Sequence, residues 1–206
     1  MGKRRKLPLA LDASLSWAAR MALTPVLCAG LPGARRGARA LGSVYPRLQP
    51  SRFQRAVANL RDAYPDATEP ELVERATDAY RHLFELAVEF AYVPRLITEE
   101  GFTRHLYFAS IAPALRTLLS QKPCILITGH VGNWELIGYA ISMLGFPMQA
   151  VYRPLDWRTL DHWVRDTRER RGLSLVSKFG AVRALPPLIR AGQPAGLVAD
   201  QSGGDR

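Results

Sequence analysis

In the second part of the chain, short continuous runs of apolar residues alternate with stretches in which apolar residues recur at helical spacing. Short apolar or β-branched runs predict buried strands at 124–129, 148–153, 173–178 and 195–199. Helical spacing predicts helices between them at 133–144, 156–171 and 180–191, with one more at 111–121 before the first strand. This alternation predicts an α/β fold, a mostly parallel sheet flanked by helices.

The first part of the chain predicts helices only. Thr68, Pro70 and Glu71 combine a capping threonine, a first-turn proline and a capping-box glutamate, so a helix is expected to begin there. Its apolar spacing continues to Pro94, where we expect it to stop. Two shorter helices, near 34–42 and 50–61, are expected on either side of Tyr45-Pro46.

The stretch from Leu7 to Leu31 is moderately apolar. Asp12 and Arg20 interrupt it, and its longest uncharged run, 21–34, falls short of the roughly 20 residues that cross a bilayer. Leu11, Leu15, Ala18, Ala22 and Val26 share one helical face, with Trp17 beside it. We therefore expect an amphipathic N-terminal helix that contacts a membrane surface. A single spanning helix and an ordinary surface helix are the alternatives.

The charge of the protein lies at one end. The net charge is +10 overall, but residues 1–61 carry +11 and residues 62–206 carry −1. We therefore expect a basic, helical, membrane-associating segment at 1–61 and an α/β domain at 62–206. Anionic lipid is the expected partner surface. Nucleic acid is not, since no recognition-helix, RNA-binding or zinc-knuckle pattern is present.

The sequence gives little support for a metal site or a disulfide bond. Cys28 and Cys124 are far apart and lack metal-ligand spacing. His82 and Glu85 stand three positions apart on a predicted helix, but no further ligand is near them. We expect no bound metal.

One strand runs directly into Gly129 and His130, and Glu135 follows in the first turn of the next helix. A neutral imidazole can remove a proton from a hydroxyl while a carboxylate on its other nitrogen stabilises the imidazolium. The spacing favours Glu135 as that carboxylate, and Asp200, at the end of another strand, is the alternative. No serine or cysteine stands beside the pair, so direct attack by an activated substrate is expected.

Two other polar residues extend this candidate site. Arg153 also ends a strand, where its guanidinium suits a phosphate, a carboxylate or the oxygen of a reacting thioester. Asn133 is the expected N-cap of the helix that carries Glu135.

The block Gly129-His-Val-Gly-Asn-Trp-Glu135 resembles the catalytic block of the bacterial lipid A biosynthesis acyltransferases, the lauroyl and myristoyl transferase family, with its HX4(D/E) pair. The resemblance runs from about residue 15 to the C-terminus. Its other matching features, in order, are Asn59-Leu60 with Tyr64-Pro65 (Tyr where Phe is usual), Val151-Tyr-Arg-Pro154, Arg170-Arg-Gly172 and Asp200-Gln201. Relatives continue beyond Arg206, so we expect a C-terminally truncated member.

The resemblance implies acyl transfer from an acyl thioester to a hydroxyl of a membrane glycolipid such as a lipid A precursor. His130 would be the general base and Glu135 its partner, with Arg153, Asn133, Asp200 and Gln201 binding substrate. The donor would be acyl carrier protein or coenzyme A as a co-substrate, with no cofactor, at the cytoplasmic face of the inner membrane. A glycerophospholipid or phosphatidylinositol-mannoside acyltransferase and a non-catalytic membrane-binding protein are the alternatives, and the sequence indicates no oligomeric state.

Overall fold

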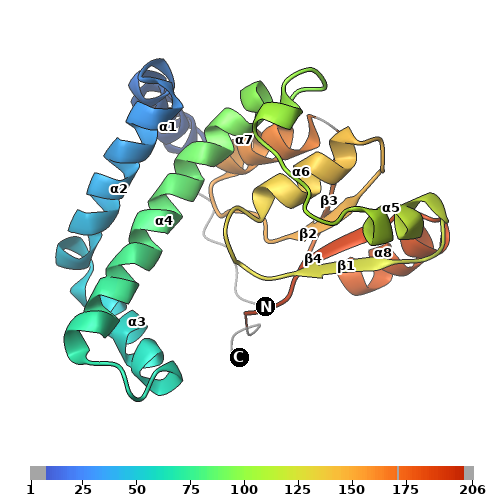
Figure 1. Ribbon diagram of the computed structural model, residues 1–206. Helices are drawn as coiled ribbons and strands as arrows, with labels where there is room; N and C mark the ends of the chain where they lie inside the picture. The colour runs from blue at the N-terminus through green and yellow to red at the C-terminus, as the bar shows by residue number, and fades with distance from the viewer. Residues whose placement is uncertain (1–7, 171, 202–206) are drawn as a thin grey trace. The chain divides into compact units, whose positions relative to one another are not determined.

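The computed structural model describes residues 8–170 and 172–201. Four strands form one all-parallel sheet in the order β1-β4-β2-β3 (Figure 1). The strands are β1 (Ile125–Thr128), β2 (Gln149–Tyr152), β3 (Ser174–Ser177) and β4 (Ala195–Val198). Each lies within one residue of its predicted bounds, so the α/β fold with a parallel sheet is confirmed.

The helices between the strands are α6 (Glu135–Met143), α7 (Arg158–Glu169) and α8 (Ala181–Arg190), and α5 (Ala112–Leu119) precedes β1. A one-turn 3₁₀ helix, η1, covers Phe102–Arg104. In this strand order, the connection from β1 to β2 through α6 and that from β2 to β3 through α7 run in one direction. The connection from β3 to β4 through α8 runs back in the other. Right-handed crossovers therefore place α8 on the opposite face from α6 and α7, as Figure 1 shows.

The chain divides into two compact units, one of residues 21–92 and the other containing residues 1–20 and 93–206. The boundary expected at 61/62 falls inside the first unit. The reason is that α3 (Pro50–Ala63) and α4 (Glu69–Leu96) share a core, in which Val57, Leu72 and Ala76 are buried. The last helix of the basic segment thus packs against the helix that follows it.

Two expected helix ends are wrong. α2 (Gly30–Leu48) continues through Pro46, and α4 continues through Pro94. Packing of α2 against α4 explains why α2 continues past Pro46. A Cβ on Gly42 would lie 2.6 Å from the Arg81 Cα, so glycine lets α2 approach α4 closely. The Tyr45 ring, 4.6 Å from that of Tyr80, holds the following turn in place.

Carboxylates of α4 form ion pairs with two of the arginines on α2. Arg39 donates to Glu85 at 3.2 Å, and Arg35 lies 3.1 Å from Glu89 and 3.7 Å from Glu85. Glu85 is therefore engaged by arginines, and the residues that the structure describes contain no metal-binding cluster. Arg47, Arg52 and Arg55 are exposed. The basic residues at 3–6 lie outside the described part of the chain.

The N-terminal helix α1 (Leu9–Cys28) exposes Leu11, Trp17 and Met21. Asp12 on the same helix is 7% exposed, and its carboxylate accepts hydrogen bonds from the backbone N–H (3.1 Å) and the hydroxyl of Thr159. A carboxylate from a distant segment thus caps α7, whose own N-cap residue, Trp157, makes no side-chain cap. Among the described helices, none has both the length and the apolarity to cross a bilayer.

Candidate active site

The site lies at the carboxyl edge of the sheet. His130 follows β1 and Asp200 follows β4, and these two strands pair along their whole length, Ile125 opposite Ala195 through Thr128 opposite Val198. Because paired parallel strands end side by side, the two residues meet although 70 positions separate them in the sequence.

Both carboxylate oxygens of Asp200 hold His130. Oδ1 lies 2.6 Å from the imidazole Nδ1, and Oδ2 accepts the His130 backbone N–H at 2.7 Å. The hydrogen bond from the His130 side chain and that from its backbone lower the pKa of Asp200, so the carboxyl group is ionised near neutral pH. An ionised carboxylate only accepts hydrogen bonds. Nδ1 must therefore carry a proton, so in the neutral form of the ring Nε2 is the nitrogen that can accept one.

Neighbouring residues fix this pair. A Cβ at Gly129 would lie 3.0 Å from Asp200 Oδ2, so a larger residue there would press against the carboxylate. The Trp134 ring packs edge-on against the imidazole, with centroids 4.7 Å apart. Sequence reasoning did not single out Trp134, although it belongs to the motif.

Glu135 is not in contact with His130. It accepts a bidentate ion pair from Arg168 of α7, with Nε–Oε2 2.9 Å and Nη2–Oε1 2.5 Å, and both side chains are largely buried. The expected His130–Glu135 pairing is therefore corrected to a His130–Asp200 pairing. Because Glu135 starts α6, its side chain reaches the neighbouring helix. The only sequence signal for Arg168 was the arginine-rich pattern of α7.

The other expected site residues lie at the same edge. Arg153 follows β2, which is next to β4, and its side chain is exposed. Gln201 is exposed and directly follows Asp200. Asn133 is not the N-cap of α6: Trp134 occupies that position without a side-chain cap. The Asn133 side chain instead lines a cavity.

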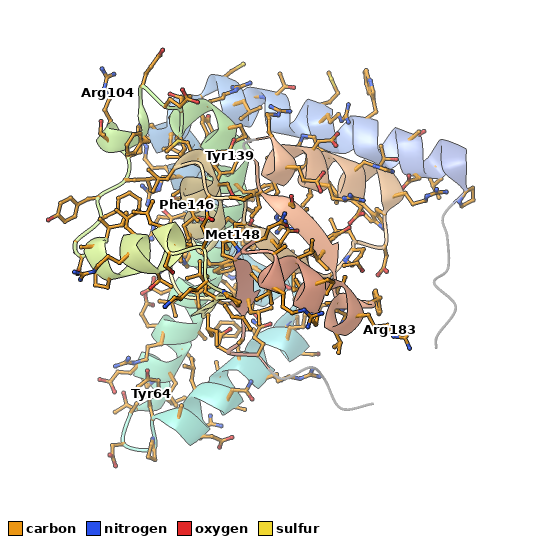
Figure 2. The ribbon with its side chains drawn as sticks, turned by 90° about the vertical axis from the view of Figure 1, so that its right-hand side faces the viewer. Tyr64, Arg104, Tyr139, Phe146, Met148 and Arg183 are labelled. Carbon is orange, nitrogen blue, oxygen red and sulfur yellow. The ribbon has the colours of Figure 1, made fainter. Side chains whose placement is uncertain are left out.

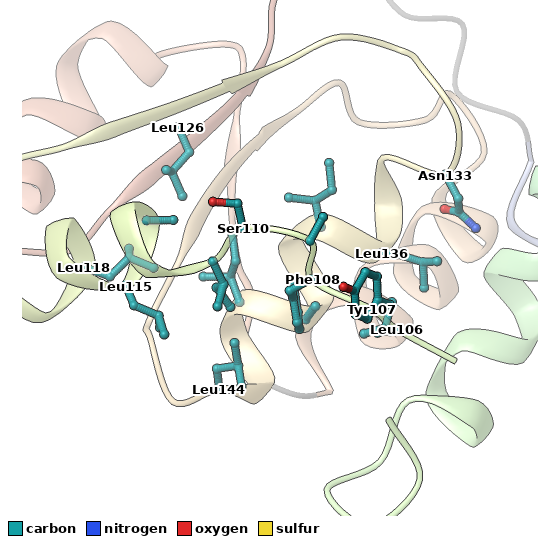
Figure 3. A pocket seen from close by; sticks show the side chains of 16 residues that line it. Leu106, Tyr107, Phe108, Ser110, Leu115, Leu118, Leu126, Asn133, Leu136 and Leu144 are labelled. Atoms are coloured by element: carbon teal, nitrogen blue, oxygen red, sulfur yellow. The ribbon is translucent and has the colours of Figure 1, made fainter. Parts of the chain in front are cut away.

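This cavity, of about 510 Å³, opens between α5, α6 and the segment 106–111. Figure 3 shows Asn133 at one end and Leu115 and Leu118 at the other. Its lining is otherwise almost wholly apolar, with Leu126 of β1 and Leu136, Ile137, Ala140, Ile141 and Leu144 of α6. Asn133 belongs to the same β1–α6 connection as His130, three positions further along the chain. An elongated apolar chain fits such a lining.

The family model described as bacterial lipid A biosynthesis acyltransferase matches residues 1–206. No curated protein matches the chain.

Proposed function

The chain belongs to the bacterial lipid A biosynthesis acyltransferase family, and from this premise we propose that His130 and Asp200 catalyse its reaction. The family makes the protein an acyltransferase that acts on lipid A precursors. The observation that carries the proposal is the 2.6 Å contact between His130 Nδ1 and Asp200 Oδ1.

In the proposed reaction, Nε2 of His130 removes the proton from an acceptor hydroxyl as its oxygen attacks the thioester carbonyl. Asp200 stabilises the imidazolium that forms. When the tetrahedral intermediate collapses, the C–S bond breaks and the imidazolium returns the proton to the thiolate. Direct transfer needs no covalent acyl-enzyme, consistent with a site built around a histidine and a carboxylate.

The apolar cavity is the proposed site of the acyl chain. The cavity reaches Asn133, in the loop that carries His130, and an acyl chain that extends from this end toward Leu118 is proposed to hold its carbonyl beside the base. Arg153, exposed at the end of the neighbouring strand, is proposed to bind a phosphate of the donor or of the acceptor. An acyl carrier protein or coenzyme A thioester is the proposed donor, and a glycolipid of the lipid A pathway is the proposed acceptor.

We further propose that the protein acts at the cytoplasmic face of the inner membrane, where residues 1–61 contact anionic lipid. Support comes from the excess of basic residues in this segment and from the exposed Trp17, Leu11 and Met21 side chains of α1.

Replacement of the base tests the function. His130→Ala should lower kcat for transfer from an acyl thioester to a lipid A precursor by about 10²–10⁴-fold and leave thermal unfolding unchanged. His162→Ala is the matched control, because His162 is exposed on α7. A His130→Ala protein that keeps turnover within threefold of the parent would remove the proposed catalytic role.

A further inference from the structure

Three loops at the carboxyl edge of the sheet expose large apolar side chains. Val131, after β1, is 80% exposed, and Trp157, after β2, is 43% exposed. After β3, Phe179 is 56% exposed and Val182, in the first turn of α8, is 87% exposed. The loops that follow parallel strands all lie at one edge, so these side chains surround the edge that holds His130.

Basic side chains stand beside these apolar ones. Arg153, Arg158, Lys178 and Arg183 are all exposed. Figure 2 shows Arg183 projecting outward from the start of α8, and the Lys178 ammonium lies 5.3 Å from the centroid of the Phe179 ring. Among the described residues, Asp156 is exposed in the β2–α7 loop, and Asp161 in the first turn of α7 accepts the Leu155 backbone N–H at 2.7 Å. The other two carboxylates, Asp200 and Glu135, are held by His130 and Arg168.

We propose that this edge, formed by Val131, Trp157, Phe179, Val182 and the four basic residues, docks on the surface of an anionic lipid bilayer. The apolar tips enter the headgroup region and the cations contact lipid phosphates. The inference rests on the proposed function, because docking by this edge would place His130 at the layer that contains the lipid acceptor. It concerns a surface different from residues 1–61.

The apolar tips favour lipid over an acidic protein. A carrier protein could satisfy the four cations, but separate loops that each expose an apolar tip would need a matching pocket for each one. A bilayer interface accepts all of them without shape complementarity. The combination of apolar insertion and positive charge is the pattern of interfacial binding.

Site-specific fluorescence tests the docking independently of the N-terminal segment. In a Cys28→Ser, Cys124→Ser background, Val182→Cys carries an environment-sensitive label. Leu119→Cys is the matched control, because Leu119 is 68% exposed where the chain leads into the opposite, amino edge of the sheet. With vesicles of phosphatidylglycerol and phosphatidylethanolamine, lipid-borne nitroxides should quench the label at position 182 at least threefold more than the label at 119.

Charge variants supply the second measurement. Lys178→Gln with Arg183→Gln should reduce quenching at position 182 and lower vesicle partitioning roughly 25-fold, about fivefold for each cation. Lys122→Gln with Arg190→Gln, one lysine and one arginine exposed near the amino edge, should change neither by more than twofold.

The outcomes separate docking from catalysis. If His130→Ala loses turnover but keeps quenching at 182, both proposals are supported. If it keeps turnover, the proposed function fails while the vesicle data still decide the docking. Equal quenching at 182 and 119, or a label that responds to an acidic carrier protein and not to vesicles, would overturn the docking proposal.

Discussion

Asp200 binds His130 through both carboxylate oxygens, one to the ring Nδ1 and one to the backbone N–H. The backbone contact fixes where the imidazole stands, and the ring contact fixes which nitrogen is basic. A single carboxylate therefore sets both the position and the tautomer of the proposed base.

This relationship predicts that Asp200→Asn loses more activity than Glu135→Gln. An amide at position 200 can donate to Nδ1, which would put the ring proton on Nε2 and abolish its basicity. We expect kcat to fall about 10²–10⁴-fold for Asp200→Asn, and by a smaller factor for Glu135→Gln. The measurement is turnover of both variants at saturating donor. A larger loss for Glu135→Gln would reverse the assignment of the catalytic carboxylate.

The Glu135–Arg168 ion pair is expected to stabilise the contact between α6 and α7. Since both groups are mostly buried and bidentate, Arg168→Gln should lower the free energy of unfolding by about 1–3 kcal/mol. The control is Arg165→Gln, whose partner Glu169 lies 3.4 Å away and where both side chains are more exposed, so a loss nearer 0–1 kcal/mol is expected. Urea titrations of the two variants give the two losses in unfolding free energy. Equal losses would mean that the buried ion pair stabilises the fold no more than the exposed one.

The cavity is expected to select acyl chain length at its Leu118 end. Leu118→Ala removes side-chain volume there and should raise kcat/KM for a donor longer by one or two carbons relative to the shorter one, by roughly fourfold per methylene. Leu119→Ala, next in sequence but 68% exposed, should leave the ratio unchanged. Because Leu118 is buried, some stability will also be lost, so the ratio of two donors on the same variant is the quantity to compare. An unchanged ratio would show that acyl chains bind elsewhere.

Asp12 is expected to stabilise α7 from a distance. Asp12→Ala removes the acceptor for the Thr159 N–H and hydroxyl and should cost about 1–2 kcal/mol of unfolding free energy. Asp66→Ala, at an exposed carboxylate, serves as the control. A double-mutant cycle with Thr159→Val should show coupling of at least ~0.5 kcal/mol. Additive effects would mean that the two side chains do not interact in solution.

The sequence alone determined the α/β class, the bounds of the strands to within a residue, and the position of His130 at a strand end. These features are local, because apolar period, glycine placement and the Gly129–Glu135 block are written in consecutive residues. The start at Thr68 was also readable: Glu71 accepts the Thr68 backbone N–H at 2.8 Å, as a capping box requires.

The order of the strands could not be predicted from the sequence, and it determines which carboxylate lies beside His130. The insertion of β4 between β1 and β2 places Asp200 beside His130, whereas spacing favoured Glu135, only five positions from the histidine. Likewise, helix packing at Gly42 carries α2 through Pro46, against the local preference of proline to end a helix. Local patterns specify which elements form. Which side chains meet depends on free energy gained between segments far apart in the chain, and no window of sequence contains that information.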